Sequence, residues 1–384
     1  MRDLGSGKTI ESDVTLPREF WLRNLYLRHY DTIRLLKENI TAMIGLAVIA
    51  SVILIAIFAP FIATQHPTSD GGWPIDLLDK FGDPNPLFLV AVTGGIVFGI
   101  LFIIVTNRYG TKPKELVPRL IVIALVLLFL TATGLVIITL YQARITHTRL
   151  LGTDLFGRDI FSRLVYGSRV SIKVGLISVG FALLLGIPMG VFAAYYGGKT
   201  DLVVSRVVDL LFSFPGIILA ILLLAALEGG VTVWHFHLFE DRLTQAMMAI
   251  GIIITPNYAR LIRSSALSVK EQEYIAAAEV TGAGDIDIII HHILPNCLSP
   301  IIVQVTMSLA TAILAEASLS FLGLGVQPPT PTWGYMMNYG LNYLRISPWM
   351  CLFSGLAITI TVLGFNMFGD GLRDAIDPRL KRER

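Results

Sequence analysis

The feature that most constrains this chain is a set of about eight apolar runs, each long enough to cross a lipid bilayer as a helix. A helix needs ~20 consecutive apolar residues to span the hydrocarbon core. Only 15% of the 384 residues are charged, whereas soluble domains contain about 25%. We therefore predict an all-α, polytopic membrane protein with spans at residues 42–62, 87–106, 119–141, 170–195, 202–227, 243–261, 301–322 and 349–368.

The basic residues predict the orientation of these spans. The loop at residues 107–119 has four basic residues and one acidic residue, and arginines recur in the polar stretch before residue 41. Because short cytoplasmic loops are enriched in Lys and Arg, both segments are predicted to be cytoplasmic. A net charge of +2 gives no argument for a nucleic-acid partner. The two cysteines, Cys297 and Cys351, form neither a metal-binding spacing nor a disulfide framework.

The stretch Glu273–Pro295 is polar and rich in small residues, although it lies between two apolar runs. Three alanines form a helical turn with almost no side-chain bulk, and Gly282 then breaks the helix because glycine tolerates a positive φ. Asp285 is the predicted N-cap of a second short helix, which is expected to end near Pro295. The stretch therefore predicts a compact helical hairpin that offers a smooth alanine surface to a partner.

This layout resembles the EAA loop of ABC-importer permeases. In that loop two alanines precede a glycine by five and four residues, as Ala277 and Ala278 precede Gly282 here, and a Leu-Pro pair follows. Leu294 and Pro295 supply that pair.

Two departures from the general loop point to one branch of the family. Ala276 stands where the loop's name-giving glutamate is expected, and His292 occupies an apolar position. Both changes resemble the dipeptide/oligopeptide permeases, in which Glu-Tyr opens the loop, here Glu273 and Tyr274, and histidine precedes Ile-Leu-Pro-Asn.

The resemblance covers residues 42–67 and 151–380, including the Gly-Thr-Asp, Gly-Arg-Asp and Ser-Arg sequence near residue 155. It implies a type I ABC importer permease fold with six family spans and two inserted ones. The expected organisation is a cytoplasmic tail (1–40), a first span (41–68), an inserted segment with two extra spans (69–148) and a permease domain (149–384) with a coupling loop (264–296).

The resemblance also implies a function. The chain is expected to form half of a translocation pathway for di- or oligopeptides in a bacterial cytoplasmic membrane, with both termini in the cytoplasm. Its implied partners are a second permease, two cytoplasmic ATPases and an extracytoplasmic solute-binding protein. ATP and Mg are expected on the ATPases, so this chain needs no cofactor and is not itself catalytic. The implied ATPase-coupling residues are Glu273, Tyr274, Ala277, Ala278, Gly282, Ala283, Asp285, Leu294 and Pro295.

A polar segment near residue 155 is a second candidate site. By the parity of the spans, residues 150–171 are extracytoplasmic. We expect Asp154, Arg158 and Asp159 to lie on the surface there, facing the binding protein.

Polar residues within the predicted spans are further candidates. Arg206 and Asp209 are three residues apart and share a helix face, so they are candidates for a structural salt bridge or for the pathway. Glu316 lies late in its span and must face protein or water. Pore lining and hydrogen bonding between helices both remain open for Glu316.

Two local patterns predict how the helices pack. Gly186 and Gly190 are four residues apart around Pro188, a spacing that lets another helix approach closely. Phe214–Gly216 contains a proline and predicts a bend in the span at residues 202–227.

Two other patterns resemble binding motifs but lack some of the residues that those motifs require. Gly5–Thr9 resembles the end of a phosphate-binding loop, but Arg2 stands where its first glycine belongs. His235 and His237, with two acidic residues after them, form an incomplete metal ligand set. We interpret them as part of an aromatic interfacial belt and predict no metal site.

Two alternative functions remain. An ion- or proton-coupled secondary carrier would use Glu316 as its titrating group, although an eight-span chain does not divide into the inverted repeats of such carriers. An importer of nickel or oligosaccharides would keep the same architecture with another substrate.

Overall fold

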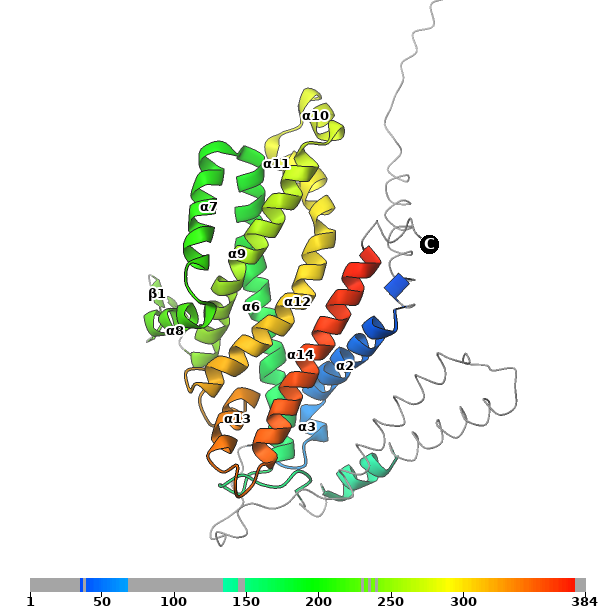
Figure 1. The fold of residues 1–384 in the computed structure, drawn as a ribbon, viewed down its shortest axis with the longest axis vertical. Helices are drawn as coiled ribbons and strands as arrows, with labels where there is room; N and C mark the ends of the chain where they lie inside the picture. The colour runs from blue at the N-terminus through cyan, green and yellow to red at the C-terminus, as the bar shows by residue number, and fades with distance from the viewer. Residues whose placement is uncertain are drawn as a thin grey trace, which may run out of the picture.

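The computed structural model describes residues 35–36, 39–67, 134–143, 149–228, 231–233, 236–238 and 241–376, and its long helices lie side by side in a bundle (Figure 1). A short apolar helix at Gly134–Ala143 lies between α3 and α6 along the chain. The other elements are α2 (Ile40–Ile57), α3 (Ala59–Ile62), α6 (Ile160–Tyr196), α7 (Gly198–Phe212), α8 (Gly216–Ala226), β1 (Val231–Val233), β2 (Phe236–Leu238), α9 (Arg242–Lys270), α10 (Glu273–Val280), α11 (Asp285–Asp287), η1 (Ile288–Ile293), α12 (Leu294–Phe321), α13 (Trp333–Leu341) and α14 (Trp349–Ile376). The all-α prediction is confirmed, and β1 and β2 add one short antiparallel hairpin.

Among the described residues, four helices are long and apolar enough to cross a membrane. They are α2, α6, the continuous helix Asp285–Phe321 and α14, and they contain most of the predicted spans at 42–62, 170–195, 301–322 and 349–368. The predicted span 243–261 lies in α9, which packs along α6 (Figure 1). Polar residues such as Gln245 and Asn257 make α9 less apolar than these four.

The predicted span 202–227 is not a single straight helix. It consists of α7 and α8, which meet at an angle of 98°. The break falls at Ser213–Pro215, as the proline pattern predicted. Pro215 has no backbone N–H to continue the hydrogen-bond ladder of α7, so the helix stops and restarts in another direction.

Several predictions lie outside the described residues. They are the span at 87–106, most of the span at 119–141, the phosphate-loop-like Gly5–Thr9 and both termini. The helix at Gly134–Ala143 is the described part of the inserted segment. The side chains of the stretch with His235 and His237 are also outside the described part.

The bundle core lies where α6, α9 and α12 meet. A Cβ atom added at Gly186 would lie 2.6 Å from the Cβ of Tyr258, and one added at Gly190 would lie 2.6 Å from the carbonyl oxygen of Ala259. A side chain at either glycine would push α6 and α9 apart. The prediction that these glycines serve close helix packing is therefore confirmed.

The two ends of the bundle differ in structure. Figure 1 shows α10 and α11 beyond the ends of α9 and α12 at one end, and α13 at the other. The buried core residues Ile262 and Ile293 form one cluster with Ile275 of α10. The hairpin that contains α10 is thus packed onto the bundle and is part of its hydrophobic core.

Candidate functional site

The hairpin of α10 and α11 is the candidate site that the sequence predicted. Gly282 has a φ of +86°, and its N–H donates to the Glu279 carbonyl at 3.0 Å. The N–H of Ala283 donates to the Ala278 carbonyl at 3.1 Å, which closes the end of α10. The predicted turn at Gly282 is confirmed, because a positive φ is cheap only for glycine.

Asp285 does not have the predicted role of a helix cap. Gly284 is the N-cap of α11, and Asp285 is the first residue of that helix. Its carboxylate accepts a hydrogen bond from the hydroxyl of Tyr195 at 3.0 Å. The capping prediction is wrong because the Asp285 side chain has a partner on another helix, which the local sequence does not reveal.

The second helix also does not end near Pro295. α11 continues through the π-helix η1 into α12, and the whole helix extends from Asp285 to Phe321. The N–H of Leu294 bonds to the Ile289 carbonyl, five residues back. A wide turn of this kind precedes Pro295, which lies in the first turn of α12, where its missing N–H is tolerated.

The hairpin is fastened to the bundle through one side of α10. Ile275 is 1% exposed and is the buried residue of α10. Beside it, the Asn296 side chain donates to the Tyr274 hydroxyl at 3.3 Å, and the rings of Tyr274 and His292 lie 6.4 Å apart. Partial burial raises the pKa of the Tyr274 phenol above its ordinary value. These contacts hold α10 against the start of α12.

The opposite side of the hairpin is exposed and partly apolar. Ala277 and Glu273 are exposed, whereas Ala278 is half-buried against the core. Val280 and Ile286 flank the glycine turn and are 89% and 67% exposed. Sequence reasoning placed a smooth alanine surface here but missed these two larger side chains. The sequence did contain a signal for them, because Val280 and Ile286 are large apolar residues on either side of a glycine turn.

The prediction that the second candidate site lies on the surface is wrong. Asp154, Arg158 and Asp159 are 1%, 8% and 1% exposed, so they do not form a surface that faces a partner. The Asp154 carboxylate accepts the backbone N–H groups of Phe156 and Arg158 and, at 2.7 Å, the Arg158 Nε. These bonds satisfy the donors of a tight turn, which explains why the charges are buried.

Asp159 links two distant segments. It is the N-cap of α6 and accepts the N–H of Ser162 at 2.9 Å. The same carboxylate accepts the hydroxyl of Thr64, just after α3, at 2.7 Å. Asp159 therefore fixes the end of the first span to the start of α6.

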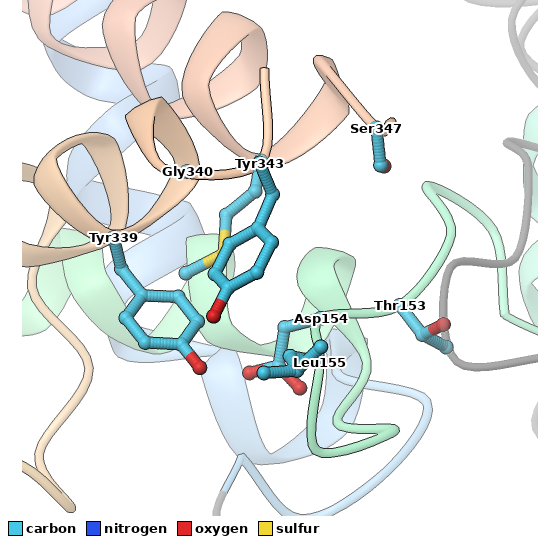
Figure 2. A pocket seen from close by; sticks show the side chains of 8 residues that line it. Thr153, Asp154, Leu155, Tyr339, Gly340, Tyr343 and Ser347 are labelled. Carbon is cyan, nitrogen blue, oxygen red and sulfur yellow. The ribbon is translucent and has the colours of Figure 1, made fainter. Parts of the chain in front are cut away.

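A small cavity lies next to this turn. Figure 2 shows the hydroxyl ends of Tyr339 and Tyr343 directed toward Asp154. The cavity has a volume of ≈ 10 Å³, which is about the room that one water needs. Burial raises the pKa of Tyr339, and the neighbouring Tyr343 adds to that effect. The arrangement ties the turn before α6 to the loop between α13 and α14.

The charged residues of α7 pair differently from the prediction. The nearest described cation to Asp209 is Arg260 of α9, at 3.6 Å, so the predicted pair with Arg206 is wrong. A second link joins Arg263 Nη2 to Asp201 at 2.6 Å. Pairing between helices replaces pairing along one helix because α7 lies against α9.

Glu316 is buried in α12. It is 1% exposed, and its Oε1 accepts a hydrogen bond from the Ser320 hydroxyl at 2.7 Å. Its Oε2 has no hydrogen-bond partner among the described residues. A groove of about 690 Å³ between α8, α12, α13 and α14 is lined by the adjacent Ala317 and not by Glu316. The geometry therefore places Glu316 inside the packed helices.

Comparison with known proteins decides the family. A family model described as "Binding-protein-dependent transport system inner membrane component" matches residues 186–382, just over half of the chain. The chain belongs to this family. A second model, "N-terminal TM domain of oligopeptide transport permease C", matches residues 30–78. The ABC-permease resemblance predicted from the hairpin is thus confirmed.

Two individual relatives, DppC and GsiD, support the same branch. The chain is 45% identical over 218 residues to the dipeptide transport system permease protein DppC of Alkalihalophilus pseudofirmus, covering 57% of this chain and 68% of that one. It is 43% identical, with the same coverage, to the glutathione transport system permease protein GsiD of Pectobacterium atrosepticum. The inward-facing methionine ABC transporter MetNI is similar at a TM-score of 0.46 and 21% identity, over 56% of this chain and 96% of that one.

The family assignment places the hairpin in context. Residues 273–295 lie inside the matched range, and the chain is a multi-pass membrane permease of an ABC transport system. Residues 79–185 lie outside the ranges of both models, and this gap contains most of the predicted insertion at 69–148.

Proposed function

We propose that this permease forms half of the translocation pathway of an ATP-driven importer of short peptides. The support for the substrate class is the names of its relatives, since dipeptides and glutathione are both short peptides. The second half of the pathway would be a sister permease, and a solute-binding protein would deliver the peptide. ATP and Mg would be bound by two ATPases, which leaves this chain without a cofactor or a catalytic role.

The observation that carries the proposal is the exposed apolar tip of the hairpin. Val280 and Ile286 are 89% and 67% exposed at the end of the bundle that holds α10. Large apolar side chains exposed together are typical of a protein interface. Membrane lipid would bind these two side chains poorly, because residues 271–287 contain five acidic and no basic residues. Such a segment is repelled by anionic headgroups.

The negative charge of the hairpin also indicates what kind of surface its partner presents. An apolar tip within an acidic segment fits a groove with an apolar floor and basic residues at its rim. We infer that this groove is on an ATPase and that the hairpin end is cytoplasmic. The turn at residues 150–159 and helix α13 would then face the outside of a bacterial cytoplasmic membrane.

The mechanism follows from how the hairpin is fastened. Ile275 packs in the bundle core, and α11 is continuous with α12 through η1. A movement of the docked hairpin would therefore move α12 as one body. ATP-driven closure of the ATPases would change the contacts of the hairpin, and that difference would shift the pathway between inward- and outward-facing states.

The test is co-purification of the tagged permease with its ATPases after Val280→Asp or Ile286→Asp. Both side chains are exposed, so the bundle should fold normally, while a charge in an apolar floor should reduce the recovered ATPase about tenfold. Ile346→Asp is the matched control, because Ile346 is 68% exposed in the loop between α13 and α14, at the other end of the bundle.

The control should retain its ATPases. If ATPase recovery is unchanged in Val280→Asp and in Ile286→Asp, the docking assignment is wrong. Gly282 is a less suitable target, because its positive φ strains any other residue and would confuse folding with docking.

Uptake of labelled dipeptides and tripeptides by proteoliposomes that contain the whole transporter tests the substrate class. Uptake of nickel or oligosaccharides in place of peptides would overturn it.

A further inference from the structure

Tyr195 lies where three helices of the bundle meet. It is in the last turn of α6, beside the end of α9 and the start of α11. Figure 1 shows these helix ends close to the hairpin. Tyr195 is 8% exposed, so its ring is packed among them.

Two polar contacts connect Tyr195 to the residues on either side of α10, one on α9 and one on α11. Its hydroxyl donates to the Asp285 carboxylate at 3.0 Å, and Asp285 is the first residue of α11. Lys270, the last residue of α9, donates from its ammonium group to the Tyr195 carbonyl at 2.6 Å. The same ammonium lies 5.4 Å from the centre of the Tyr195 ring. We call these three residues, Lys270, Tyr195 and Asp285, the base clamp.

The base clamp is important because α6 is not adjacent to the hairpin along the chain: α7, α8, β1, β2 and α9 lie between them. The hairpin continues directly into α9 on one side and into α12 on the other, so these two helices follow it without further contacts. In the described part of the chain, the Tyr195 hydroxyl makes a hydrogen bond that joins α6 to the hairpin. The acceptor is a carboxylate, and the oxygen–oxygen distance of 3.0 Å lies at the long end of the range for such hydrogen bonds.

We propose that Tyr195 is a positioning residue that transmits hairpin movement into α6. This inference rests on the proposed function, in which ATPases move the hairpin. With the base clamp intact, α6 and α12 move together when ATP closes the ATPases. Without the Tyr195 hydroxyl, α12 still moves because it is continuous with α11, whereas α6 is moved only through its packing, chiefly against α9, and follows less far. The partner ATPases then hydrolyse ATP while the permease does not complete the change in its pathway.

The test measures the movement of each helix separately in the assembled transporter. Spin labels on cysteines introduced at Leu54 of α2 and Leu184 of α6 report α6, and labels at Leu54 and Leu314 report α12. All three leucines are exposed, at 52%, 69% and 49%. The native Cys297 and Cys351 are replaced by alanine. Distances are compared between the nucleotide-free and the ATP–vanadate-trapped transporter.

In the unmodified permease both distances should change on trapping. Tyr195→Phe should keep the α12 change and reduce the α6 change, because α6 is then moved only through its packing, chiefly against α9. Peptide uptake per ATP hydrolysed should fall about fivefold or more, the size of a typical coupling between sites. The adjacent Tyr196→Phe is the matched control: Tyr196 is 52% exposed and outside the base clamp, so both distances should change as before.

Variants of Asp285 separate positioning from simple loss of structure. Asp285→Asn keeps an oxygen that can accept the Tyr195 hydroxyl, so it should retain the full α6 movement, whereas Asp285→Ala should reduce it as Tyr195→Phe does. The double variant Tyr195→Phe with Asp285→Ala should be no worse than either single change. Thermal stability and ATPase recovery should be unchanged in Tyr195→Phe, and the α6 distances of the Asp285 variants are measured on the fraction that retains its ATPases, because Asp285 is also an implied docking residue.

Two results would overturn the proposal. One is an α6 distance change in Tyr195→Phe equal to that of the unmodified permease, and the other is a diminished α6 change in Asp285→Asn transporters that retain their ATPases. Failure of the proposed function gives a different result, since no ATPase would then co-purify with the unmodified permease and neither distance would respond to ATP–vanadate.

Discussion

The attachment of α10 to the bundle should depend mainly on Ile275. α10 has eight residues, which is too short for a helix to be stable in water without tertiary packing. Ile275 is its buried residue, at 1% exposure, and Ile275→Ala leaves a cavity in the core. Such a change costs about 2–5 kcal/mol. Because the lost packing energy lowers the local stability of the hairpin, α10 should unfold locally far more often while the rest of the bundle stays folded.

Hydrogen exchange of the α10 amides in the detergent-solubilised permease measures this opening. Since ~1.4 kcal/mol corresponds to a factor of ten, exchange should accelerate at least thirtyfold in Ile275→Ala. Val280→Ala is the control on the same helix, because Val280 is 89% exposed and its truncation should change stability by less than about 0.5 kcal/mol. Equal exchange rates in the two variants would refute the view that Ile275 holds the hairpin.

Two further predictions concern the local structure at opposite ends of the bundle. Asp159→Ala removes the cap of α6 and leaves the Thr64 hydroxyl without its acceptor, so it should lower stability by about 1–3 kcal/mol and lower the thermal unfolding temperature in detergent. An unchanged unfolding temperature would contradict the buried link. Gly282→Ala should destabilise the hairpin by about 1–2 kcal/mol because of its φ of +86°. Gly284→Ala should not, because Gly284 has a φ of −73° and open space around it, and hydrogen exchange of the α10 amides compares the two.

The parts of the fold that the sequence predicted correctly depend on local properties. An apolar run of about twenty residues is enough to predict a spanning helix, and α2, α6 and α14 follow from such runs. Gly282 predicted a turn because backbone sterics alone restrict a positive φ. Pro215 predicted a break for an equally local reason.

The errors arise where distant segments decide the outcome. Asp159 looks like a surface residue in a polar stretch, but its partner Thr64 is 95 positions away and buries it. Tyr195 is 90 positions from Asp285, so no local pattern predicts that Asp285 accepts its hydroxyl and does not cap α11. The pair of Asp209 with Arg260 likewise depends on how α7 lies against α9. Charged residues in a membrane protein usually form ion pairs or hydrogen bonds, but the tertiary fold determines which residues pair.

The same contacts suggest why α6 is a suitable element for transmission. Its 37 residues correspond to about 55 Å of helix, which is longer than the hydrocarbon core is thick, at ~30 Å. At one end Asp159 fixes α6 to the segment after α3, and at the other Tyr195 fixes it to the hairpin. Between these ends Gly186 and Gly190 hold α6 in backbone contact with α9. If α6 moves as one unit, as the proposed transmission requires, a displacement applied at Tyr195 reaches Asp159 at its other end, and spin-label distances measured at both ends of α6 would test this.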